Sequence, residues 1–181
     1  MTMTYSEYKA LPQGRYNDFP TISTDPRIQR MGGTMLSHGQ GQYLDVPFIT
    51  EVATNLWQGG CQDGLVLPVE IKHMLSLYVS ESYTVEHKLR TRHEVQMYDA
   101  SDQSMAQVDR WARWVNARRK TGPVLVHCQA GLNRSGLIVA RALMMEDAEY
   151  YTADEAIEEL RSKRSPLVLC NTDFEEYLRS L

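Results

Sequence analysis

The pattern of apolar and polar residues predicts a sheet that begins near Phe48. Short runs with the composition of strands, each apolar or alternating, occupy residues 49–52, 56–58, 74–79 and 94–98. Val124-Leu125-Val126 differs from these runs because it is wholly apolar and rich in β-branched residues. Such a run is typical of a strand that is buried on both faces. We therefore expect it to lie at the centre of the sheet.

Apolar residues spaced three and four positions apart predict helices in the second half of the chain. The first has its apolar face on Met105, Val108, Trp111 and Val115, and ends near Thr121. Its expected capping box is Ser104 with Gln107, and a second box, Thr152 with Glu155, precedes a helix that runs to about Lys163. A further helix is expected from Ser135 to Met145, and Asn171 is placed to cap a last one. Strands that alternate with helices indicate an α/β fold.

The first 45 residues have a different character from the rest. Glycines and prolines interrupt every apolar pattern there before it completes a turn. We expect residues 1–45 to form an irregular N-terminal extension, either a loosely packed arm or a lid or recruiting segment, and residues 46–181 to form one catalytic domain.

Composition and charge narrow the class of protein. The chain has 181 residues, of which 43% are hydrophobic and 23% charged, as expected for a single globular domain. The net charge of −4 argues against extended nucleic-acid contacts. No apolar run is long enough to cross a bilayer, and the first residues do not resemble a signal peptide. We expect a cytoplasmic protein without a membrane partner; its oligomeric state stays open.

The three cysteines, Cys61, Cys128 and Cys170, are too few and too scattered for a disulfide framework. We interpret Cys61 and Cys170 as structural, with a redox partnership to Cys128 as the alternative. Cys128 stands apart because of the residues around it.

The segment between the predicted central strand and its helix carries the candidate chemistry. It reads His127-Cys128-Gln129-Ala130-Gly131-Leu132-Asn133-Arg134-Ser135. Successive backbone N–H groups in a tight loop that opens a helix form an anion-binding nest, and the helix dipole reinforces it. The predicted phosphate-binding residues are Gln129, Ala130, Gly131, Leu132, Asn133 and Arg134.

Each side chain of this loop has an expected role. Arg134 supplies a planar fork that grips two phosphate oxygens, and Gly131 allows a sharp turn. The positive field would hold Cys128 as a thiolate, which is the nucleophilic form. His127 would fix the shape of the loop, and Ser135 would donate its hydroxyl to the sulfur when a phosphoenzyme breaks down.

The motif resembles the His-Cys-x5-Arg-Ser/Thr signature of the cysteine-dependent protein tyrosine phosphatase superfamily, and the chain from about Phe48 looks most like its small dual-specificity branch. The resemblance implies a single α/β domain with a central, mostly parallel sheet of about four or five strands, flanked by helices on both faces. It also implies no metal and no cofactor. The implied activity is hydrolysis of phosphotyrosine, with phosphoserine or phosphothreonine as further substrates, through a cysteinyl-phosphate intermediate.

The resemblance also implies a general acid, an Asp on a loop one strand and one helix before the cysteine. Asp99 and Asp102 both lie there, and we favour Asp99 because it directly follows the predicted strand 94–98. The resulting catalytic set is Cys128, Arg134, Asp99, Ser135 and His127.

Several readings of the substrate remain. The uncharged loop residues favour a phosphorylated protein over a polyanionic lipid headgroup. The Asn133-Arg134 step resembles the RNA 5′-triphosphatases of the same superfamily, so an RNA 5′ end is one alternative. A basic rim would serve it, formed by Arg90, Arg92 and His93 together with a second cluster that is more simply the solvated face of its helix: Arg110, Arg113, Arg118, Arg119 and Lys120. Two further alternatives concern the activity itself: a noncatalytic phosphoprotein-binding module and a rhodanese-like sulfurtransferase.

Overall fold

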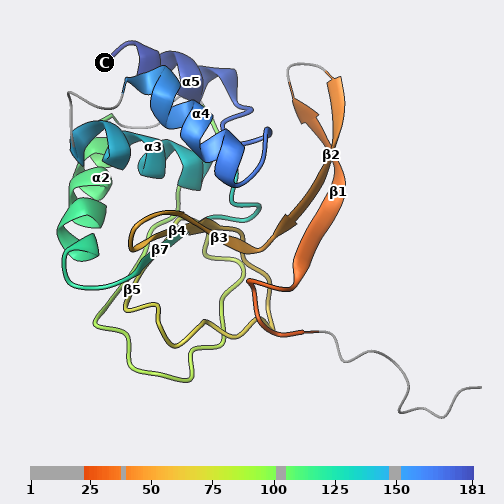
Figure 1. The fold of residues 1–181 in the computed structure, drawn as a ribbon, viewed down its shortest axis with the longest axis vertical. Helices are drawn as coiled ribbons and strands as arrows, with labels where there is room; N and C mark the ends of the chain where they lie inside the picture. Colours follow the sequence, from red (N-terminus) through yellow and green to blue (C-terminus); the bar gives the residue numbers. More distant parts are fainter. Residues whose placement is uncertain (1–22, 38–39, 101–104, 147–151) are drawn as a thin grey trace, which may run out of the picture.

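The computed structural model describes residues 23–37, 40–100, 105–146 and 152–181. Within these residues the chain forms an α/β domain around a five-stranded sheet with the strand order β3-β4-β7-β5-β6 (Figure 1). The strands are β3 (Ile49–Ala53), β4 (Leu56–Gly59), β5 (His73–Ser76), β6 (Thr91–Glu94) and β7 (Val124–His127). Strand β3 runs antiparallel to β4, and all other neighbours are parallel. The expected fold class is confirmed.

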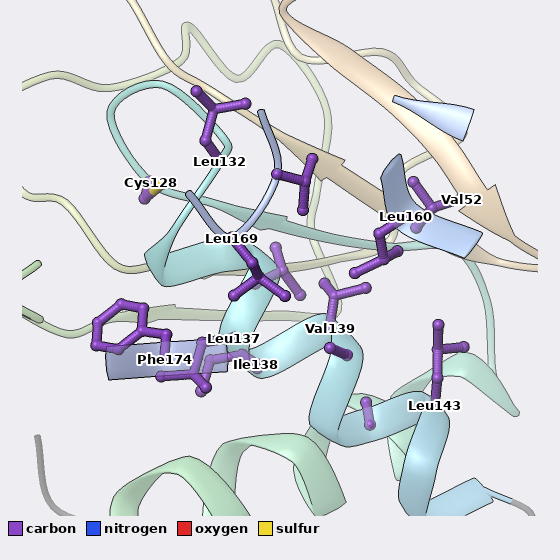
Figure 2. Close-up of a cluster of buried hydrophobic side chains, with 14 of the residues drawn as sticks. Val52, Cys128, Leu132, Leu137, Ile138, Val139, Leu143, Leu160, Leu169 and Phe174 are labelled. Carbon is purple, nitrogen blue, oxygen red and sulfur yellow. The ribbon is translucent and has the colours of Figure 1, made fainter. Parts of the chain in front are cut away.

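Strand β7 lies at the centre of the sheet, between β4 and β5, as its apolar sequence predicts. All four of its residues are buried. The chain then passes through the loop 128–133 into helix α3 (Arg134–Glu146). This helix is buried over most of its first half because Leu137, Ile138 and Val139 pack into the main hydrophobic core (Figure 2).

The helices of the described residues cover one face of the sheet. They are α2 (Met105–Arg119), α3, α4 (Ala153–Lys163) and α5 (Thr172–Arg179). Val124 and Val126 face them, whereas Leu125 faces a second cluster that includes Leu65 and Ile71 from the segment between β4 and β5. The expectation of helices on both faces is therefore not met in the described residues, because the segments that cover the second face are loops.

The helix caps follow the sequence closely. The Thr152 side chain accepts a hydrogen bond from the backbone N–H of Glu155, and the Glu155 carboxylate accepts one from the N–H of Thr152. Asn171 caps α5 by accepting from the N–H of Asp173. Helix α2 begins at Met105, and its predicted cap, Ser104, lies outside the described residues. No described helix has the length and apolar character needed to cross a membrane.

Part of the predicted irregular extension is a regular hairpin. Strands β1 (Arg30–Ser37) and β2 (Gln40–Pro47) pair antiparallel along their whole length and project beside β3 (Figure 1). The glycines of this stretch break a helical pattern but are tolerated in a two-stranded ribbon. Leu44 and Val46 alternate with exposed neighbours and pack into the core, so they tie the hairpin to the domain. Strand β2 of this hairpin crosses the boundary expected at residue 45.

The strand predicted over 94–98 lies earlier in the chain, at β6. Beyond β6 the chain stays extended beside the end of β5, since the N–H of Val95 donates to Ser76 O (2.8 Å) and that of Met97 donates to Leu77 O (3.4 Å). The alternation of apolar and polar residues around Val95 and Met97 therefore reflects an extended segment that continues beyond the end of β6. It still delivers Asp99 to the carboxyl end of the parallel strands.

Candidate active site

The loop after β7 is held open by hydrogen bonds on its outer side. The carbonyl oxygen of Gln129 accepts from the N–H of Cys61 (3.0 Å), and that of Leu132 accepts from the N–H of Leu169 (3.3 Å). The carbonyls of Ala130 and Gly131 accept from the guanidinium of Arg164. Each carbonyl from 129 to 132 is therefore bound from outside the loop.

This arrangement decides where the amides of the loop point. In a trans peptide unit the C=O and the following N–H point in opposite directions. The N–H groups of residues 130–133 therefore face the inside of the loop. Among the described residues, none accepts a hydrogen bond from the N–H of Ala130, Leu132 or Asn133. The inside of the loop is thus lined by free donors, as an anion-binding nest requires.

Gly131 is the residue on which the bend depends. Its φ of +68° lies in the left-handed region. A Cβ added there would lie 2.2 Å from the carbonyl carbon of Gly59 and 2.4 Å from the nitrogen of Gly60. The loop is packed against the end of β4 so closely that only glycine fits.

The sulfur of Cys128 lies on the inner side of the loop. The N–H of Gly131 donates to it over 3.3 Å, and the hydroxyl of Ser135 is 3.5 Å away. Cys128 is only 2% exposed, and Ser135 is fully buried at the start of α3. The sequence-predicted pair of thiol and hydroxyl is therefore within contact distance.

Arg134 begins α3 and is also buried. Its Nη1 donates to the carbonyl of Met97 (3.2 Å), and its guanidinium carbon lies 5.2 Å from the centre of the Tyr78 ring. Its Nε is buried with no hydrogen-bond partner in the described part of the chain. A buried donor without an acceptor is costly, so this group is suited to a ligand oxygen.

His127 supports the loop as a neutral side chain. It is buried, its Nδ1 lies 3.4 Å from the carbonyl oxygen of Cys128, and its ring meets that of Tyr83 edge-on at 5.3 Å. Burial lowers the pKa of His127 to about 4. At neutral pH this histidine therefore contributes shape and hydrogen bonding to the loop, and no positive charge.

Asp99 is joined to the loop by two amide side chains. Asn133 donates to one carboxylate oxygen of Asp99 (2.9 Å), and Asn171 donates to the other (2.7 Å). Asn133 in turn accepts from the backbone N–H of Asn171 (3.0 Å). The loop, the start of α5 and the exposed Asp99 thus form one hydrogen-bonded cluster. The alternative acid, Asp102, lies outside the described residues.

Arg164 is the functional residue that sequence reasoning missed. It follows α4 and is only 6% exposed. Besides the loop carbonyls, it donates to Pro47 O (3.2 Å), Phe48 O (3.2 Å) and Thr50 Oγ1 (3.1 Å). Burial lowers its pKa to about 10, so it keeps its charge at neutral pH. In sequence it looks like an ordinary cation at a helix end, and no local signal marks it.

Replacing Arg164 with methionine is expected to deform the loop. The carbonyl oxygens of Ala130 and Pro47 would lose the donor that Arg164 supplies, whereas Gly131 O keeps Gln58 and Phe48 O keeps the N–H of Gly60. We expect a cost of about 3 kcal/mol in the free energy of unfolding. We expect urea denaturation to show this decrease in stability, and kcat/KM for the reaction expected from the sequence to drop about tenfold. Arg113→Met is the control, because the Arg113 side chain is 68% exposed and pairs with Asp109 at the surface. Equal stability of the two variants would contradict the bracing role.

The other two cysteines lie outside the hydrogen-bonded cluster around Asp99 or at its edge. Cys61 is buried under the hairpin, and Cys170 lies near the loop, where its thiol donates to Asn133 Oδ1 (3.4 Å). All three cysteines are free thiols. In the described ranges, no group of three or more His, Cys, Asp or Glu side chains is placed to hold a metal ion.

Three residues of the predicted basic rim are compensated by carboxylates. Arg113 pairs with Asp109, Arg92 pairs with Glu94, and the buried Arg119 pairs with Glu146. Arg90 donates to the backbone of Thr121, which leaves its charge uncompensated. These ion pairs reduce the basic character of the predicted rim.

The site defines the class of protein: it is an anion site centred on a cysteine. It consists of a buried parallel strand, a loop whose amides point inward around the cysteine, and a helix that starts with arginine. Within that class, residues 62–181 match the family model of the dual specificity phosphatase catalytic domain. The match covers more than half of the chain, so the protein belongs to the dual-specificity phosphatase family. The expected resemblance is confirmed.

Solved structures share the fold at low sequence identity. Human DUSP28 is 18% identical with a TM-score of 0.61, and the alignment covers 74% of this chain and 92% of that one. The Orf virus tyrosine phosphatase OH1 is 20% identical with a TM-score of 0.56, over 72% and 83% of the two chains. TpbA of P. aeruginosa is 19% identical with a TM-score of 0.56, over 74% and 84%. No curated protein sequence matches the chain.

Proposed function

We propose that the chain is a phosphatase that hydrolyses phosphotyrosine, with phosphoserine and phosphothreonine as further substrates, through a cysteinyl-phosphate intermediate. The observation that carries this proposal is the unfilled donor set around Cys128. The buried Nε of Arg134 and the inward amides of Ala130, Leu132 and Asn133 have no acceptor among the described residues. The oxygens of a phosphate monoester would satisfy these donors together.

The proposed reaction has two steps. The Cys128 sulfur attacks phosphorus while the ester P–O bond breaks, and Asp99 transfers its proton to the departing oxygen. Arg134 and the loop amides stabilise the charge on the three equatorial oxygens. Water then attacks the cysteinyl phosphate, Asp99 takes up one of its protons, and the S–P bond breaks. Ser135 donates a hydrogen bond to the leaving sulfur, and inorganic phosphate is released.

The contacts of Asn133 favour a monoester over an RNA 5′ end. In this structure both ends of the Asn133 amide are used within the protein, toward Asp99 and the backbone of Asn171. The asparagine is thus accounted for as a connection between the loop and the general acid, without a triphosphate. Arg92, Arg113 and Arg119 each pair with a carboxylate, which weakens the basic rim that a bound RNA would need.

A turnover panel tests this function. The full chain is assayed with a phosphotyrosine peptide, a phosphothreonine peptide, a phosphoinositide and 5′-triphosphorylated RNA, with phosphate release as the readout. We expect the phosphotyrosine peptide to have the highest kcat/KM. Faster release from RNA would favour the triphosphatase, and tight peptide binding without any phosphate release would indicate a noncatalytic reader.

A further inference from the structure

A cavity opens beside the phosphate-binding loop. It has a volume of about 580 Å³, and the loop residues Gln129 and Ala130 form part of its wall. The other walls include Arg30 and Met31 of the hairpin strand β1, and Glu81 from the segment after β5. We call it the hairpin pocket. The β1 residues lie outside the part of the chain that matches the family model.

The hairpin is well placed to give this pocket a defined shape. Its base is held to the loop by Arg164, which donates both to Pro47 O at the end of β2 and to Gly131 O in the loop. Met31 packs closely at the same place, because a Cβ added to Gly60 would lie 2.6 Å from the Met31 methyl carbon and 2.6 Å from Gln129 O. The pocket therefore forms one structural unit with the phosphate-binding loop.

The charge of the pocket is negative. Arg30 is compensated, since its guanidinium donates to Asp45 Oδ1 and to Asp45 O, each at 2.6 Å. Glu81 is half-buried, and no ion pair or hydrogen bond to its carboxylate occurs in the described part of the chain. Burial, together with the nearby carboxylates of Glu81 and Asp63, raises the pKa of the Cys61 thiol to about 12. The floor of the pocket thus experiences a negative field, which the smaller opposing effect of Arg92 offsets only in part.

The pocket also has apolar walls beside its carboxylate. Met31, Phe48 and Ala130 line the pocket together with Glu81. A long side chain with an apolar stem and a cationic tip matches this combination, because the stem covers apolar surface while the tip meets the carboxylate. A polyanion such as RNA or an inositol polyphosphate would be repelled.

We propose that the hairpin pocket is a specificity subsite that binds a lysine or arginine side chain close to the phosphorylated residue of a protein substrate. This inference rests on the proposed function, because the phosphate must occupy the neighbouring loop. A phosphorylated residue bound there places its chain neighbours across the rim formed by Gln129 and Ala130. One of them then reaches Glu81.

The test is a set of phosphotyrosine peptides in an alanine background, with a single arginine moved from three positions before to three positions after the phosphotyrosine. At one or two positions we expect arginine to raise kcat/KM about fivefold over alanine, and glutamate there to lower it. Glu81→Lys should reverse this order, and Glu81→Gln should abolish the preference. Glu86→Lys is the matched control, since Glu86 lines a different cavity on the same segment and should keep the wild-type preference.

The outcomes separate the two proposals. If all peptides are hydrolysed equally well by the wild-type chain, the subsite is wrong and the phosphatase function stands. If arginine is preferred but Glu81→Lys and Glu81→Gln leave the preference intact, the basic side chain binds elsewhere and the pocket assignment fails. If no peptide is hydrolysed while RNA or phosphoinositide is, the proposed function is overturned and the subsite with it.

Discussion

Replacing Cys128 with serine is expected to abolish hydrolysis of a small aryl phosphate, with a loss of kcat on the order of 10⁴-fold or more. The serine hydroxyl is far less nucleophilic than a thiolate, and His127 is not placed to take its proton, because the histidine ring is buried against the carbonyl of Cys128. The variant should still bind a phosphotyrosine peptide, since the loop amides and Arg134 are unchanged. Turnover by a continuous aryl phosphate assay and binding by fluorescence anisotropy measure the two effects.

The matched control is Cys170→Ser. The thiol of Cys170 also lies near the loop, and a serine there keeps a donor for Asn133 Oδ1. We expect turnover close to that of the wild-type chain. If Cys128→Ser keeps full turnover, the covalent mechanism is excluded. If Cys170→Ser is the inactive variant instead, the nucleophile has been misassigned.

Replacing Asp99 with alanine is expected to lower kcat by an amount that depends on the leaving group. A phosphate ester with a poor leaving group needs a proton on the departing oxygen, so its kcat should fall by about 10²- to 10³-fold. An ester of an acidic phenol leaves without this help and should lose much less. The measurement is kcat for a series of aryl phosphates plotted against the acidity of the leaving phenol.

The hydrogen bonds of Asp99 provide a further variant. Asn171→Ala removes one of its two amide donors, so the acid is held less firmly, and part of the same leaving-group dependence should appear. A purely structural role of Asn171 at the start of α5 would lower kcat equally for all esters. The assignment of Asp99 is overturned if Asp102→Ala gives the steep dependence and Asp99→Ala does not.

Most of the domain follows from patterns that are local in the chain. The capping box at Thr152 and the cap at Asn171 occur where the sequence places them, because each involves residues two or three positions apart. The central strand is recognisable because burial on both faces leaves no polar position in Val124-Leu125-Val126. The hairpin is less evident in the sequence, because its strands contain several glycines and the alternation of a half-buried strand is confined to the region of Leu44 and Val46.

The resemblance to the family predicts helices on both faces of the sheet, and the second face differs from this expectation. Loops cover this face in the described residues, and their buried side chains, such as Leu65 and Ile71, are too irregularly spaced to reveal a period. The position of β6 has a similar cause. An extended chain alternates its side chains whether or not its backbone belongs to the hydrogen-bonded ladder, so Val95 and Met97 look like strand residues.

The sequence by itself determined the order of strands and helices from β3 onward and the residues of the loop from His127 to Ser135, because the patterns that indicate them are local in the chain. Only the tertiary structure decided what surrounds that loop. Arg164 lies 33 residues from Gly131 and 117 from Pro47, and Asn171 lies 72 from Asp99. Contacts over such separations leave no period or spacing in the chain, since they depend on how the sheet, the hairpin and the last helices pack together.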